Sequence, residues 1–119
     1  MSYVDSFVVP VPAKNLAAYR RMSKTMQKVW LDHGALEYRE FAADDVKPGK
    51  STSYARSVKL KAGEIVVIGV ITYKSRAQRD RINAKAMKDK RLAAMMDPKS
   101  LPFDGKRMFW GGFTPLGKT

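Results

Sequence analysis

Residues 65–71, IVVIGVI, constrain the fold of this chain more than any other segment. The segment holds only apolar residues and glycine, whereas a strand with one face in water alternates apolar and polar side chains. It is therefore predicted to be part of a strand, residues 64–73, that is buried on both faces. Any fold proposed for the chain has to cover both sides of a sheet at this strand.

The segments around this strand predict the order strand, helix, strand, strand, helix, strand. A first helix begins near Ala13, has its large apolar residues three and four positions apart, and ends at Gly34. A second helix begins at Ser75, which forms a capping box with Gln78. Asp89 is expected to cap a further short helix. The other predicted strands are residues 3–11, 35–42 and 107–114, and residues 52–64 are expected to hold a short extended piece.

This order is typical of a ferredoxin-like sandwich, an α+β fold written βαββαβ, with an antiparallel sheet and both helices on one face. The 119 residues are expected to form a single domain, 1–119, because the chain is too short for a second core. Two helices cover only one face of a strand that needs burial on both. The simplest cover for the other face is the sheet of a second copy of the chain, so a homodimer is expected.

The segment PFDGKRMFWGGF, residues 102–113, contains the most motif-like feature of the sequence, the pair Gly111 and Gly112. A phosphate-binding glycine loop needs a helix directly after its glycines, so that backbone N–H groups point at the anion. No helix pattern follows here, and Asp104 and Gly105 give a turn signal before strand-forming residues. The glycines are therefore predicted to lie in a strand, where they leave space beside Trp110 for a ligand or a partner chain.

Five segments of the chain carry a family resemblance: YVDSFVVPVP, HGALEYRE with Asp44, Asp45 and Val46 after it, SRAQRDRINAK, MMDP and PFDGKRMFWGGF. Together they resemble the YbaA-like family of uncharacterised bacterial proteins, over nearly the whole chain. This resemblance implies a ferredoxin-like subunit of the dimeric α/β-barrel superfamily, in which two sheets meet face to face, and it implies no particular activity. One departure is Tyr54 and Ala55, where the resemblance leads us to expect Phe-Pro.

Polar side chains on the predicted strands are the best candidates for a site, since burying them costs free energy unless they are paired or used. Glu37 and Arg39 are two residues apart and so share one face of their strand. One interpretation is a salt bridge at a subunit interface, and the other is a small cavity between two sheets that orients an organic ligand. The first function class left open is therefore an enzyme or small-molecule binder that binds or transforms a small organic molecule in this cavity, and no catalytic residue is assigned. The candidate ligand-binding residues are Tyr3, Asp5, Glu37, Arg39, Arg107 and Trp110.

The formal net charge of +12 raises nucleic-acid binding as an alternative function. The basic residues are densest on the second predicted helix, which lacks interleaved aromatic residues for base stacking. We therefore expect at most weak, sequence-independent binding, and a solvated basic face is the simpler interpretation. A purely structural or regulatory dimer is the third function class left open. The basic residues concerned are Arg76, Arg79, Arg81, Lys85, Lys88, Lys90 and Arg91.

The sequence contains no cysteine and a single histidine, His33, so thiolate metal sites and imidazole clusters are not expected. Neither a metal nor a cofactor is predicted. His33 is expected to face the negative end of the first helix. The first residues enter a strand pattern without a signal peptide, and the longest apolar run is far shorter than the roughly 20 residues that cross a bilayer. A soluble, cytoplasmic protein without a membrane partner is expected.

Overall fold

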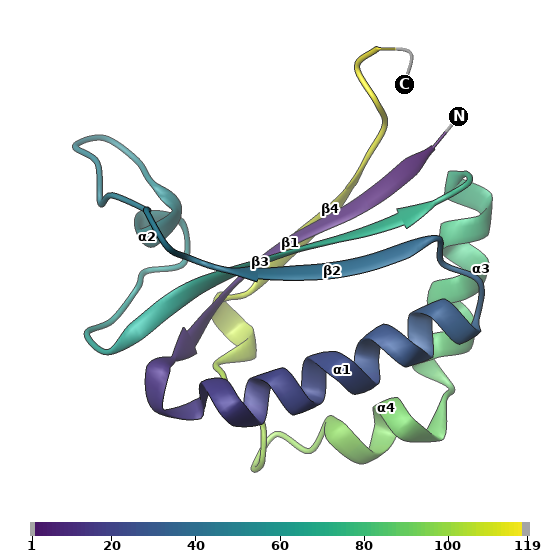
Figure 1. Ribbon diagram of the computed structural model, residues 1–119, viewed down its shortest axis with the longest axis horizontal. Coiled ribbons are helices and arrows are strands. Elements are labelled where there is room, and N and C mark those ends of the chain that lie inside the picture. Colours follow the sequence, from purple (N-terminus) through teal and green to yellow (C-terminus); the bar gives the residue numbers. More distant parts are fainter. Residues whose placement is uncertain (1, 118–119) are drawn as a thin grey trace.

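The computed structural model describes residues 2–117, and its centre is one four-stranded antiparallel sheet (Figure 1). The strands lie in the order β2-β3-β1-β4, so the two longest strands are in the middle. This arrangement and the order of the elements confirm the predicted α+β, ferredoxin-like class. β1 spans Tyr3–Pro12, β2 spans Glu37–Ala42, β3 spans Glu64–Tyr73 and β4 spans Phe109–Phe113.

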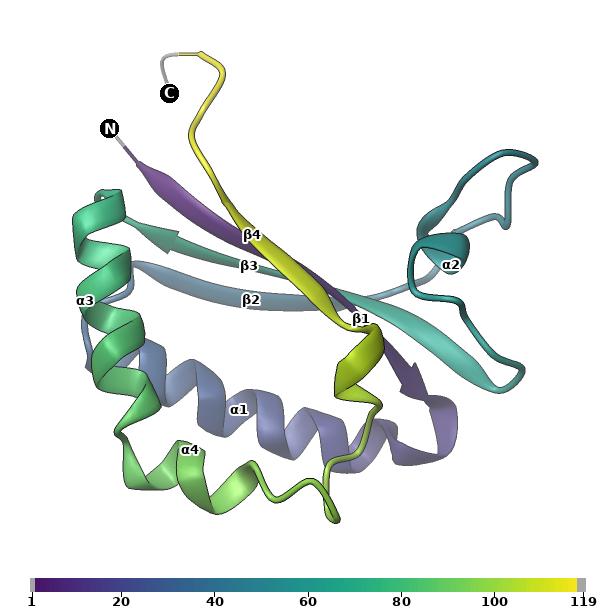
Figure 2. The same cartoon turned by 180° about the vertical axis from the view of Figure 1, so that it is seen from behind.

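Three helices lie on one face of the sheet, as Figure 1 and Figure 2 show from opposite sides. One of them begins at the predicted cap, where the Oγ of Ser75 accepts a hydrogen bond from the N–H of Gln78 at 3.1 Å. The Oε1 of Gln78 accepts from the N–H of Lys74 at 2.6 Å, one residue further back than in a standard capping box. The helices are α1 (Leu16–Asp32), which follows a 3-10 turn at Ala13–Asn15, α3 (Arg76–Met87) and α4 (Lys90–Met95).

The pleat of the central strands turns every second side chain toward the helices and into the main core. Phe7 of β1 lies opposite Gly69 of β3 on this face. A Cβ atom at position 69 would lie only 2.0 Å from the Phe7 ring, so the glycine provides the space that the ring fills. Val9 and Val11 continue the same side of β1 and are fully buried. The sheet therefore meets the helices through the odd-numbered residues of β1.

The opposite side of the sheet, which we call the open face, is only partly covered. Near one end Val8 and Val66 are buried against Val58, which follows the short helix α2 (Tyr54–Ser57). Along the rest of β3, the residues on this face are half-buried, so burial on both faces is complete only where Val58 packs. The open face consists of Val4, Ser6, Val8 and Pro10 of β1, Glu37, Arg39 and Phe41 of β2, Val66, Ile68, Val70 and Thr72 of β3, and Phe109, Gly111 and Phe113 of β4.

The helical turn α2 replaces the short extended piece that the sequence predicted for this region. Ser53 caps the turn, because its Oγ accepts from the N–H of Arg56 at 3.1 Å. The guanidinium of Arg56 donates to the carbonyls of Pro48 and Gly49 at 3.2 and 3.1 Å, which holds the preceding loop against the turn. These local hydrogen bonds satisfy backbone groups that an extended segment could satisfy only by joining the sheet.

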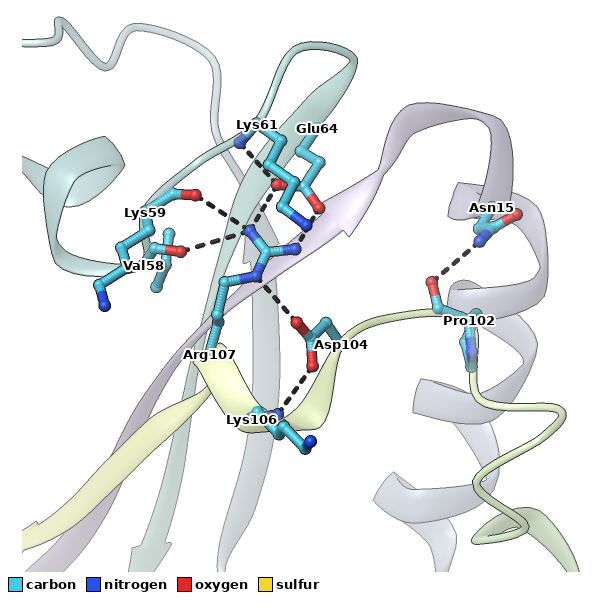
Figure 3. A network of polar contacts seen from close by, with 9 residues as sticks. All are labelled: Asn15, Val58, Lys59, Lys61, Glu64, Pro102, Asp104, Lys106 and Arg107. Atoms are coloured by element: carbon cyan, nitrogen blue, oxygen red, sulfur yellow. Dashed lines mark hydrogen bonds and ion pairs between the residues drawn. The ribbon is translucent and has the colours of Figure 1, made fainter.

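The last strand is shorter than predicted, because Arg107 lies in a 3-10 turn, Gly105–Arg107, rather than in β4. Asp104 caps this turn through the N–H of Lys106 at 3.0 Å. The Arg107 guanidinium donates to both carboxylate oxygens of Glu64 at 2.7 and 2.6 Å and to the Lys59 carbonyl at 3.1 Å (Figure 3). The arginine therefore clamps the start of β4 onto the beginning of β3.

Candidate functional site

A cavity of about 230 Å³ lies between the helices and the sheet. Its wall is largely apolar and comes from α1, α3, α4 and all four strands. Asp5 and Asn83 are the exceptions, and both contact the hydroxyl of Tyr73. The cavity therefore has a long apolar wall and one polar end. Such a combination is typical of small-molecule sites, in which a few polar groups orient a mainly apolar ligand.

The apolar wall is rich in methionine. Met22 and Met26 are four residues apart on α1, so they share the side of that helix that faces the cavity. Met87, the last residue of α3, also lines the cavity and is 66% exposed, which places it where the cavity meets solvent. Unbranched thioether side chains fill irregular spaces and adjust to different occupants. Part of this wall can therefore adapt its shape.

Four elements, β1, β3, α1 and α3, hold the polar end together. The Tyr73 hydroxyl of β3 lies 3.1 Å from Oδ2 of Asp5 and 3.3 Å from Oδ1 of Asn83 on α3. The indole N–H of Trp30, on α1, donates to the same Asn83 oxygen at 3.1 Å. Burial and the neighbouring Asp5 carboxylate raise the pKa of Tyr73, so its hydroxyl remains a hydrogen-bond donor.

Asp5 forms a buried ion pair with Arg79 at this end. The Nη1 atom of Arg79 lies 3.4 Å from Oδ1 of Asp5, and the two residues are only 9% and 5% exposed. Within residues 2–117, that carboxylate oxygen accepts no hydrogen bond. Burial raises the pKa of Asp5, and the hydrogen bonds of Tyr73 and Asn83 and the Arg79 charge act in the opposite direction. The carboxylate is thus desolvated and surrounded by these three partners.

Aromatic rings on β1 and β4 enclose the Arg79 guanidinium. Its central carbon lies 5.1 Å from the ring centre of Tyr3 and 5.8 Å from that of Trp110, within the range of cation–π attraction. Its Nη2 atom also donates to the Tyr3 hydroxyl at 2.9 Å. A Cβ atom at Gly112 would lie 2.0 Å from that hydroxyl oxygen, so the space at this glycine is filled by Tyr3 of the same chain.

A second polar cluster ties α1 to the edge strand β2. The Glu40 carboxylate accepts hydrogen bonds from the hydroxyls of Tyr19 and Ser23, and from that of Tyr38 at 3.2 Å. Burial and the Glu40 charge raise the pKa of both tyrosines, which keeps them protonated as donors. Tyr19 and Tyr38 also line the cavity, so this cluster fixes part of its wall.

The structure brings together three of the six predicted ligand-binding residues. Tyr3, Asp5 and Trp110 lie on the helix-facing side of the sheet and meet at Arg79. Glu37 and Arg39 are exposed on the open face, on the other side of the sheet. Arg107 forms its own ion pair with Glu64, away from both groups. The six residues therefore do not form one cluster within a subunit.

The predicted basic surface requires a correction at Arg79, because this side chain is buried rather than presented to solvent. Arg91 is engaged by Asp32 and Asp89 at 2.7 and 2.9 Å, and Arg76 lies 3.8 Å from Asp80. These acidic neighbours lower the local positive charge. The remaining predicted basic residues, Arg81, Lys85, Lys88 and Lys90, have exposed or partly exposed side chains.

The sequence does hold a signal for the burial of Arg79. Arg79, Ile82 and Ala86 are the buried residues of α3, and their spacing of three and four places them on one side of the helix. An arginine on an apolar stripe needs a buried partner, and Asp5 is that partner. Nothing comparable in the sequence indicated that the Asn83 amide and the Tyr73 hydroxyl meet, because the polar end of such a side chain is usually solvated.

No group of three or more metal-binding side chains occurs among the described residues. Over the same part of the chain, no helix has the length and apolar character needed to span a membrane.

Comparisons with known proteins identify relatives of the chain without identifying an activity. A family model described as a protein of unknown function, DUF1428, matches residues 2–105. The uncharacterised protein YbaA of Escherichia coli strain K12 is 44% identical over 116 residues, which cover 98% of this chain and 97% of that protein. The uncharacterised protein YbaA of Shigella flexneri shows the same identity and coverage.

Two solved structures share the fold at low sequence identity. A dimeric ferredoxin-like protein from an uncultured marine organism gives a TM-score of 0.65 at 10% identity, and the match covers all of both chains. An uncharacterised NIPSNAP-like domain protein from Burkholderia xenovorans gives a TM-score of 0.58 at 14% identity, over 99% of this chain and 88% of that one. At these identities the likeness concerns the fold alone.

Proposed function

The chain belongs to the DUF1428 family of proteins of unknown function, and from its structure we propose that it binds a small, mainly apolar organic molecule in the cavity between the helices and the sheet. The observation that supports this most strongly is the polar end. Asp5 and Asn83 form this end, and the rest of the lining is mainly apolar. A mainly apolar molecule with a polar group at one end would match this arrangement.

The size of the cavity limits the size of the ligand. Its volume of about 230 Å³ lies between two reference values. An engineered cavity of roughly 150 Å³ holds benzene, and pockets for drug-sized molecules start at roughly 300 Å³. A molecule with one or two rings therefore fits, whereas a nucleotide or a haem does not.

A matched pair of variants tests this proposal. Met87→Trp places a large ring at the mouth of the cavity, and Lys85→Trp adds the same ring to an exposed position of α3 that does not line it. The probe is 4-methylanisole, and calorimetry measures its affinity. We expect the Met87 variant to lose binding and the Lys85 variant to keep the wild-type affinity. No binding to the wild type, or equal binding to both variants, would count against the cavity as the site.

The open face supports a second proposal, that the chain is a homodimer with its sheets packed together. Three large aromatic residues on this face, Phe41, Phe109 and Phe113, are 42%, 46% and 56% exposed. Exposed apolar patches of this kind mark interaction surfaces. The related fold from the marine organism is dimeric, which agrees with such an assembly. Glu37 and Arg39 would then face the partner's sheet, so any site between the sheets would exist only in the dimer.

Sedimentation at micromolar concentration tests the assembly. A homodimer has twice the chain mass of 13.4 kDa. Phe113→Lys places a charge on the open face and is expected to yield monomers. Leu31→Lys changes an apolar residue of similar exposure on α1, outside that face, and is expected to leave the dimer intact. A wild-type protein that is a folded monomer at this concentration would contradict the proposal.

A further inference from the structure

We propose that the protein binds to an anionic membrane surface through the side on which the cavity opens. The contact consists of three exposed apolar residues that line the cavity, Met87, Met96 and Trp110, which we call the rim, and of the basic residues around it. The partner is a lipid bilayer with negatively charged headgroups. The binding itself does not need a ligand in the cavity, whereas the entry of a ligand from the bilayer rests on the proposed function.

The rim is apolar and open to solvent. Met87, Met96 and Trp110 are 66%, 47% and 59% exposed, although all three line the cavity. They come from the end of α3, from the residue after α4 and from β4, and these elements lie on the near side of the molecule in Figure 2. Exposed apolar side chains gathered around one opening mark an interaction surface.

The acidic residues of the helices are already engaged. Each of them forms an ion pair with an arginine of the helices, so none is left to neutralise the other basic side chains of this side. The pairs are Asp32–Arg91, Asp80–Arg76, Asp80–Arg79 and Asp89–Arg91.

The other basic residues of the helical side keep their charge uncompensated. They are exposed, and none of them forms an ion pair within residues 2–117. A surface with a surplus of one sign attracts a partner of the opposite sign. The residues are Arg20, Arg21, Lys24 and Lys28 of α1, Arg81 and Lys85 of α3, and Lys88 and Lys90 at the junction of α3 and α4.

Two of these lysines adjoin the rim in sequence. Lys88 follows Met87 directly, and Lys90 is the first residue of α4. The acidic residue beside Met96, Asp97, is offset by Lys99 two positions later. Positive charge therefore remains next to the apolar rim. Each lysine near an anionic membrane strengthens binding by roughly fivefold.

The combination of charge and rim favours a bilayer over a nucleic acid. Lysines and arginines contact phosphates in either partner, but the thioethers of Met87 and Met96 contribute nothing to a contact with a phosphate backbone. At a bilayer such side chains enter the boundary between headgroups and acyl chains, where tryptophan is also favoured. Such peripheral binding needs no spanning segment, whose absence led us to expect no membrane partner from the sequence.

The position of this surface agrees with the two proposals above. The rim borders a cavity that suits a mainly apolar molecule, and such molecules concentrate in lipid, so a docked cavity would face its source of ligand. The open face lies on the other side of the sheet from the helices. A dimer formed through the open face would therefore leave the rim of each subunit free.

Vesicles of two compositions test the proposal on the unmodified protein. One kind contains phosphatidylcholine alone, and the other contains equal amounts of phosphatidylcholine and phosphatidylglycerol. Co-sedimentation measures binding, which we expect only to the anionic vesicles and which added salt should weaken. Trp110 is exposed whereas Trp30 is buried, so a shift of tryptophan emission to shorter wavelength reports entry of the rim into the bilayer.

Two matched pairs of variants locate the surface. Lys88→Gln with Lys90→Gln should weaken binding by about 25-fold, the effect of two lysines. Lys47→Gln with Lys50→Gln removes the same charge from the exposed loop before α2, at the opposite end of the molecule from α3, and should change binding little. Met87→Gln should weaken binding by about tenfold, through lost apolar burial. Val46→Gln, in the same distant loop, is its control and should have no effect.

Several outcomes would overturn the inference. They are equal binding to neutral vesicles, equal losses in the two lysine pairs, and binding to anionic vesicles without a shift in tryptophan emission. A single-stranded oligonucleotide that binds more tightly than the anionic vesicles would identify nucleic acid as the partner instead. None of these outcomes affects the proposed function, because 4-methylanisole tests the cavity in the absence of lipid.

Discussion

The hydroxyl of Tyr3 occupies the position where a side chain at Gly112 would begin, 2.0 Å from a Cβ atom built on that glycine. The two residues come from opposite ends of the chain and meet because β1 and β4 are paired, with Asp5 opposite Gly112. The same hydroxyl accepts a hydrogen bond from the buried Arg79. Gly112 therefore allows β4 to pass beside the ion pair that ends the cavity.

Substituting the two adjacent glycines should have different effects on stability. Gly112→Ala forces Tyr3 away from Arg79 and is expected to lower the free energy of unfolding by about 1–3 kcal/mol, the usual effect of overpacking. Gly111→Ala is the matched control, because a Cβ atom there would meet only the Phe113 ring at 3.6 Å, an ordinary contact. Urea denaturation measures both variants. Equal stability of the two would show that Tyr3 can move without loss.

Arg79 and Arg81 provide a second matched pair on one helix. Arg79→Met leaves Asp5 buried without its cationic partner, and we expect a loss of roughly 3 kcal/mol at neutral pH. Arg81→Met alters an exposed residue and should change stability little. Adding Asp5→Leu to the Arg79 variant removes the unpaired carboxylate and should restore part of the loss. If Arg79→Met leaves the free energy of unfolding unchanged, the ion pair does not stabilise the fold as expected.

The Arg107 clamp should make the protein sensitive to acid. The hydrogen bonds from Arg107 lower the pKa of Glu64 below its ordinary value of 4.5. A carboxyl group whose pKa is lower in the folded protein adds stability above its unfolded pKa and loses that contribution as the pH falls through the folded pKa. The melting temperature should therefore decrease as the pH is lowered below about 4.5. In Arg107→Met this fall should be smaller, and calorimetry at several pH values compares the two proteins. Identical pH profiles would show that the clamp contributes nothing to acid stability.

The cap of α3 should have a modest and local effect. Ser75→Ala removes the side-chain acceptor for the Gln78 N–H, so we expect a loss of about 1 kcal/mol in the free energy of unfolding. Ser51→Ala serves as the control, because Ser51 is exposed and, within residues 2–117, forms no side-chain hydrogen bond. Thermal denaturation distinguishes the two variants. A loss well above the expected value would indicate that Ser75 has a further role.

Local signals in the sequence were sufficient for most of the secondary structure. Ser75 and Asp89 cap helices where predicted, because a cap depends on only three or four neighbouring residues. The glycine pair at 111 and 112 lies in a strand, as the absence of a following helix pattern predicted. The extended piece predicted within residues 52–64 was wrong, since the Ser53 cap and the docking of Val58 were not weighed against strand propensity.

The face of β2 could not be assigned from its sequence, because charged residues alternate onto both sides of the strand. Glu37 and Arg39 lie on the open face, whereas Glu40 faces the helices. The reason is tertiary: the hydroxyls of Tyr19 and Ser23 on α1 accommodate the Glu40 carboxylate. A polar residue can face the helices only if another element supplies such partners, and α1 does so from a distant part of the sequence.

By itself, the sequence determined the order of the four strands and the long helices and the α+β class, because periodicity, caps and turn residues act over a few neighbours. Only the tertiary structure decided which polar residues meet. Asp5 and Arg79 are far apart in the chain and become partners because α3 packs beside the end of β1. The cavity likewise exists only where methionines and aromatic residues from separate elements fail to fill the space between the helices and the sheet. Its position depends on packing between distant segments, which no local pattern specifies.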